Sequence, residues 1–166
     1  MKLFKNLLLA TALCLVTVSF TQAQSKVAHI NTQELVAAMP ETAIATKQLE
    51  TLGKTYEADM QTMATELQNK VKQYDSEAAT KTQEENGKRM QELQTMEQNV
   101  RQFQGTAQQD LAKKRQELMA PIQEKAMKAI NAVAKAKGFQ YVLDRSTLIV
   151  ADGTDILADV KKELGI

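Results

Sequence analysis

The chain has 166 residues, of which 25% are charged and 4% are aromatic, with no tryptophan and one cysteine. Its 21 basic and 20 acidic residues nearly cancel, which excludes the general basic field of a nucleic-acid-binding protein. The length suffices for one domain, and the abundance of Ala, Gln, Glu, Lys, Leu and Met favours long helices over a thick globular core.

Residues 1–23 have the pattern of a cleaved secretory signal. Lys2 and Lys5 precede an apolar run from 7 to 20, and the small residues Thr21 and Ala23 occupy the two positions that a signal peptidase recognises. A membrane anchor is the alternative, but the apolar run is shorter than the ~20 residues that span a bilayer. We therefore predict cleavage after Ala23 and an exported mature chain of residues 24–166.

The predicted mature chain offers little to metals or cofactors. Cys14 leaves with the signal, so residues 24–166 contain no cysteine and no thiol nucleophile. His29 is the only histidine and has no second histidine or cysteine with which to share a metal. We interpret it as a packed or surface residue and expect no cofactor.

Residues 24–40 predict the first part of a small body. The segment 26–31 is short and rich in apolar side chains, which is typical of a strand. Asn31 or Thr32 is placed to cap a short helix that carries Leu35 and Met39. Pro40 ends that helix or begins the next one.

Residues 41–121 predict a helical hairpin, which we call the arm. Two apolar stripes with steps of three and four residues are separated by a polar tip near 76–88, which has no apolar residue larger than alanine. The first stripe is Leu49, Leu52, Tyr56, Met60, Met63, Leu67, Val71 and Tyr74; the second is Met90, Leu93, Met96, Val100, Phe103, Ala107 and Leu111.

An antiparallel register for the arm follows from these stripes. Facing residues in such a pair have numbers with a constant sum, and a sum of 159 pairs Tyr56 with Phe103 and Met63 with Met96. The turn then falls near Ala79. We expect the two helices to bury their stripes against each other.

Residues 122–166 predict the rest of the body. The runs 139–143 and 147–151 are strand-like, with a hairpin turn between them, and a last helix follows. With 26–31 they predict a three-stranded sheet whose exposed edges favour assembly of several copies. The candidate oligomerisation residues are Val27, Ile30, Tyr141, Leu143, Ile149 and Val150. The predicted fold is mainly α, with a long antiparallel helical hairpin projecting from this small β body.

Both ends of the mature chain resemble one known family. The opening segment 26–32 (KVAHINT) and the closing segments 141–144 (YVLD), 149–151 (IVA) and 155–162 (DILADVKK) are similar to those of the Skp family of OmpH-like periplasmic chaperones. The resemblance covers essentially all of residues 24–166. It is specific in the body segments and weak in the arm, where coiled coils look alike.

The resemblance implies a homotrimer in the periplasm whose three arms surround a cavity. It also implies that unfolded outer-membrane proteins are held in this cavity without the use of ATP. Arms of the family are typically basic, and a lipopolysaccharide site has been proposed for them. Residues 41–120 of this chain depart from that pattern, with 11 basic and 13 acidic side chains. We therefore carry over no lipid site and leave contact with membrane or lipopolysaccharide open.

Seven stripe residues are candidates for binding unfolded clients, because methionine and aromatic side chains suit surfaces that accept many shapes. They are Tyr56, Met60, Met63, Leu67, Met90, Met96 and Phe103. The alternative is ordinary packing between the two helices. Gly53 and Gly105 weaken their helices and are candidates for an arm hinge, with close helix approach or plain tolerance of glycine as the alternatives.

We find no pattern of an enzyme. A phosphate-binding glycine loop, G-x-S-x-G and H-E-x-x-H are all absent from the sequence. The favoured function is an ATP-independent periplasmic holdase for unfolded outer-membrane proteins. The alternative is a structural or adaptor coiled coil of the cell envelope that docks one folded partner.

Overall fold

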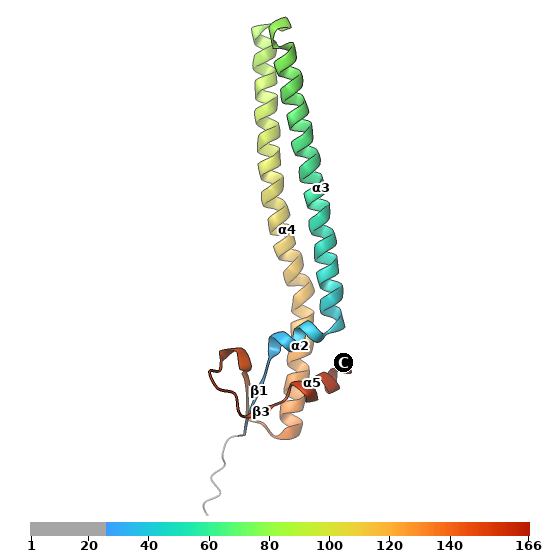
Figure 1. Ribbon diagram of the computed structural model, residues 1–166, viewed down its shortest axis with the longest axis vertical. Helices are drawn as coiled ribbons and strands as arrows, with labels where there is room; N and C mark the ends of the chain where they lie inside the picture. Colours follow the sequence, from blue (N-terminus) through green and yellow to red (C-terminus); the bar gives the residue numbers. More distant parts are fainter. Residues whose placement is uncertain (1–25) are drawn as a thin grey trace, which may run out of the picture.

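The computed structural model describes residues 26–166. The predicted signal peptide, residues 1–23, lies outside the described residues. A long helical hairpin rises from a small body that contains a three-stranded sheet and two short helices (Figure 1). The predicted mainly helical fold, with a long hairpin and a small three-stranded sheet, is confirmed.

The hairpin consists of α3 (Pro40–Glu77), a 3₁₀ turn η1 (Ala78–Thr80) and α4 (Gln83–Lys137). Pro40 occupies the first turn of α3, where its missing N–H costs nothing. Thr82 and Glu85 form a reciprocal capping box that begins α4. Gly138, in the left-handed conformation, ends α4. Helix α4 continues past Pro121, and the turns that follow this proline pack in the body.

The sheet has β1 (Val27–Ile30) at its centre, with β2 (Tyr141–Asp144) and β3 (Thr154–Asp155) on either side. Both neighbours run parallel to β1, and the register places Ala28 beside Val142 and Thr154. The long excursion through the hairpin returns the chain beside β1 in the parallel sense, as a crossover connection allows.

The predicted antiparallel hairpin of 139–143 and 147–151 is wrong. Asp144 accepts hydrogen bonds from the Ser146 N–H and hydroxyl, which turns the chain into a 3₁₀ segment, η2 (Arg145–Thr147). The chain then continues without ladder pairing until β3 begins at Thr154. The apolar run 147–151 has strand propensity, but Ile149 and Val150 are exposed and only Leu148 and Ala151 are half-buried.

The core lies in the body rather than in the arm. Helix α2 (Thr32–Ala38), capped by the Asn31 side chain, and helix α5 (Leu157–Leu164) pack around the lower part of α4. The most deeply buried side chains are Ile30, Leu35, Met39, Ile156 and Val160. Residues of α4 complete the cluster: Ile122, Ala126, Ala129, Ile130 and Val133.

Candidate functional site

The seam of the arm is held by an aromatic pair. The rings of Tyr56 and Phe103 meet edge to face, with centroids 5.9 Å apart. This contact agrees with the predicted register for that pair. The Tyr56 hydroxyl also donates to Asp110 across the seam at 2.6 Å, and this bond raises the pKa of Tyr56 above its ordinary value of 10.0.

The candidate client-binding residues fall into two groups. Six of them are half-buried in the seam, because two helices alone cannot cover large side chains fully: Tyr56, Met60, Met63, Leu67, Met96 and Phe103. Met90 is 59% exposed and lies towards the tip. The arm also exposes Ile44 to the same extent, and this residue lies one position away from buried Ala45 and outside the predicted stripe. In the sequence, the sign of this exposed position is an apolar residue that lies out of phase with the helical stripe.

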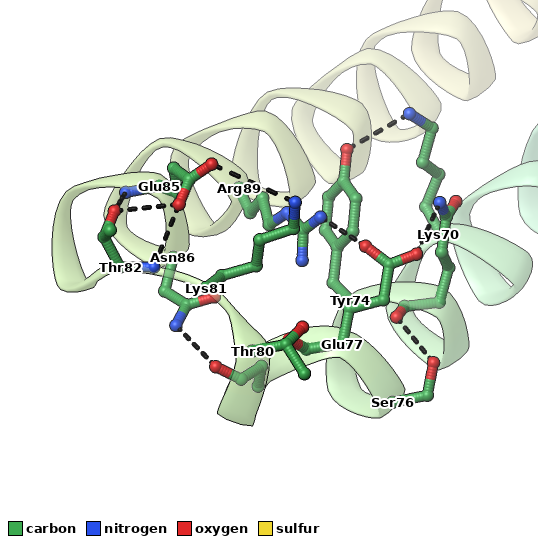
Figure 2. Close-up of polar contacts among 12 residues, drawn as sticks. Lys70, Tyr74, Ser76, Glu77, Thr80, Lys81, Thr82, Glu85, Asn86 and Arg89 are labelled. Atoms are coloured by element: carbon green, nitrogen blue, oxygen red, sulfur yellow. Dashed lines mark hydrogen bonds and ion pairs between the residues drawn. The ribbon is translucent and has the colours of Figure 1, made fainter.

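The tip is closed by a polar network (Figure 2). The Arg89 guanidinium lies 4.5 Å from the ring centroid of Tyr74 and pairs with Glu77. Lys70 donates to Glu92 at 2.9 Å, and the Tyr74 hydroxyl donates to the same carboxylate. Aromatic and charged groups from both helices therefore lock the end of the hairpin.

The network also pairs the cations near the tip. Lys88 lies 2.6 Å from Glu84, and Lys81 lies 4.0 Å from Glu85. Lys70 and Arg89 have carboxylate partners as described above. A cluster of unpaired cations of the kind that binds phosphate groups is thus not formed by these four residues.

Acid is expected to loosen this tip. Hydrogen bonds from Tyr74 and Lys70 lower the pKa of Glu92, and those from Gln73 and Arg89 lower the pKa of Glu77, from an ordinary value of 4.5. Because each pKa is lower in the folded chain, the stabilisation is complete above about pH 4.5 and is lost as the pH falls through the folded values. Thermal unfolding followed by circular dichroism should show a falling Tm in that range.

The matched variant is Glu77→Gln with Glu92→Gln. It should unfold at a lower temperature than the wild type at neutral pH, and its Tm should fall less between pH 5 and pH 3. Equal acid sensitivity of the two proteins would show that the tip carboxylates do not contribute.

The two arm glycines are open rather than crowded. A Cβ placed on Gly53 or Gly105 would meet no atom within 4 Å. Close helix approach therefore does not explain either residue. The hinge remains a prediction.

Grooves lie between the helices at the base of the arm and at the body. One, of about 970 Å³, is bounded by α3 and α4 and includes Gly53. Another, of about 690 Å³, lies where α2, α4 and β2 meet, and includes Val142, Leu143 and Met127. Both are wide troughs on the surface, which suits a chain-like ligand more than a small molecule.

The body exposes apolar side chains around its sheet. Val27, Tyr141, Leu143 and Val150 are all exposed, and Ile149 is 103% exposed. Ile30 differs from the other candidate oligomerisation residues, because it is 1% exposed and packs inside its own protomer. We call these five exposed residues, Val27, Tyr141, Leu143, Ile149 and Val150, the body face.

His29 has a structural position. It is buried in β1, and its Nε2 lies 3.2 Å from the carbonyl oxygen of Gly153. This hydrogen bond fixes the residue that directly precedes β3. Within residues 26–166, no group of three or more His, Cys, Asp or Glu side chains is arranged to hold a metal ion. None of the helices in this range is long and apolar enough to cross a bilayer.

Comparison with known proteins identifies relatives along almost the whole described chain. The pattern of the family described as outer membrane protein (OmpH-like) matches residues 26–164. The chaperone protein Skp of Pectobacterium atrosepticum is 26% identical over 144 residues, which cover 86% of this chain and 87% of that protein. The chaperone protein Skp of Yersinia enterocolitica is 27% identical over 167 residues, and the match covers 96% of this chain and 99% of that protein.

A solved structure has the same fold. The crystal structure of an OmpH-like outer membrane chaperone from Caulobacter crescentus superimposes with a TM-score of 0.76. The match covers 87% of each chain at 19% sequence identity. The long hairpin on a small sheet is therefore shared with that protein.

Proposed function

The chain belongs to the OmpH-like outer membrane protein family, and we propose that it is an ATP-independent periplasmic holdase for unfolded outer-membrane proteins. Its curated relatives are chaperones named Skp. The family consists of chaperones rather than enzymes, so the expectation of a non-enzymatic protein is confirmed.

The observation that carries the proposal is the incomplete burial of the arm seam. Methionine, leucine and aromatic side chains lie half-exposed along the two helices, and the groove between the helices at the base of the arm is open to solvent. Such a surface offers many weak apolar contacts, which suits clients of varied sequence. A holdase of this kind lowers the free concentration of the unfolded chain by binding it.

A homotrimer joined through the body face is the assembly that we propose. Exposed apolar side chains on a sheet edge and an adjoining loop are costly in water and mark an interaction surface. Joining copies through the body leaves three arms free to surround a client. Bending of each arm at Gly53 and Gly105 would let the arms adapt to clients of different size.

Contact with lipid is not part of the proposal. The arm carries a small excess of acidic residues, and the cations at its tip face carboxylates. Apolar contact, rather than a positive cavity, is the source of affinity in this mechanism.

Light scattering after size exclusion tests the proposal on the mature chain from residue 24. The mass is measured alone and after an unfolded outer-membrane barrel is diluted from urea into the protein. We expect a trimer that keeps the unfolded barrel soluble in a complex and ignores the folded barrel. Precipitation of the barrel, or binding of one folded partner instead, would support the adaptor alternative.

A further inference from the structure

The groove at the base of the arm has an apolar floor and a polar rim. The floor consists of Leu49 on α3 and of Leu111 and Met119 on α4, all of which are half-buried. The two helices run close together near the tip and diverge towards the body, where this groove opens (Figure 1). At about 970 Å³ it matches the upper range of ligand pockets, enough for a few side chains of a peptide.

Gly53 keeps this groove open. Apart from proline, glycine is the least favourable residue in a helix interior, and Gly53 lies in the interior of the 38-residue α3. A Cβ there would meet no atom within 4 Å. A larger side chain at 53 would lie over the preceding turn, next to Leu49, and would fill the groove.

Two unpaired charges flank the groove from opposite helices. Glu50 on α3 and Arg115 on α4 both line it, and neither forms an ion pair with any other residue of 26–166. By contrast, the adjacent Lys113 and Lys114 both lie close to Glu117. Arginine offers only donors and a carboxylate only acceptors. An extended polypeptide backbone presents both complements, a carbonyl for Arg115 and an N–H for Glu50.

We propose that this groove binds an extended segment of an unfolded polypeptide client, with apolar side chains on the floor and backbone groups at Arg115 and Glu50. The inference rests on the proposed holdase function and assigns it a preferred binding site at the arm base. Affinity for the segment comes from the floor, and orientation comes from the two charges.

The test fills the groove and compares matched positions. Gly53→Leu is paired with Gly87→Leu, because Gly87 is also a helical glycine with nothing within 4 Å but lies near the tip. Binding of an unfolded, fluorescently labelled outer-membrane barrel is titrated for each variant. We expect Gly53→Leu to weaken binding by roughly tenfold, as expected for a central contact, and Gly87→Leu to leave it unchanged.

A second pair tests the rim. Arg115→Gln should weaken binding about threefold, in the net range of one ordinary hydrogen bond, whereas Lys114→Gln should not. Circular dichroism confirms folding of every variant, and the mass of each is measured by light scattering.

The remaining outcomes separate the possible errors. Equal binding by both glycine variants overturns the groove while leaving the holdase intact. Dissociation of the assembly by Gly53→Leu shows that the groove is a contact between copies and overturns the proposal. Equal weakening by Gly53→Leu and Gly105→Leu assigns the glycines to a hinge instead. Failure of the wild type to hold the barrel overturns the holdase and this inference together.

Discussion

Replacing Ile149 with aspartate is expected to separate the assembly into folded monomers. Ile149 is fully exposed in the protomer, so the substitution removes no contact within the chain. In the proposed trimer the side chain is buried at the body face. Burial of an aliphatic side chain is worth about 1.5–3 kcal/mol, and an unpaired carboxylate in its place adds a desolvation cost. Each trimer would carry three such defects.

The measurement is the mass by light scattering across a range of protein concentrations. Ile149→Asp should be monomeric where the wild type is trimeric, with an unchanged circular dichroism spectrum. Met90→Asp is the matched control, because Met90 is an exposed apolar residue on the arm. A trimeric Ile149→Asp protein would exclude this loop from the interface, and a monomeric Met90→Asp protein would place the interface on the arm.

Truncating a core side chain should lower the free energy of unfolding far more than the same truncation in the arm. Leu35 on α2 is 0% exposed and packs in the body cluster. Leu35→Ala should lower the free energy of unfolding by about 2–5 kcal/mol, through lost burial and the cavity that remains. Leu67→Ala removes the same atoms from the half-buried seam, and should cost roughly 1 kcal/mol.

Urea unfolding monitored by circular dichroism compares these two variants at matched protein concentrations. The comparison is repeated over a concentration series, because assembly contributes to apparent stability. Similar costs at the two positions would mean that the arm seam is covered as well as the core, as it would be if the arms packed against each other. That result would also remove the half-exposed surface on which the holdase proposal depends.

The helices could be predicted from the sequence alone, because they depend on local patterns. Steps of three and four residues define each stripe, and Pro40 and Gly138 mark the ends of helices through backbone constraints that act within one turn. The Tyr56–Phe103 contact followed from the positions of the two stripes around one turn.

The sheet topology and the surface of the arm required the tertiary structure. Strand propensity in 147–151 is real, but whether a strand pairs depends on which backbone lies beside it, and β1 already has β2 and β3 on its two sides. The basal groove depends on how far α3 and α4 diverge, and the tip network on which side chains meet across the turn. Neighbouring residues along the chain are enough to specify the helices and their apolar faces, so these features can be read from the sequence. The parallel sheet and the open groove arise from contacts between distant segments, so they depend on the tertiary structure.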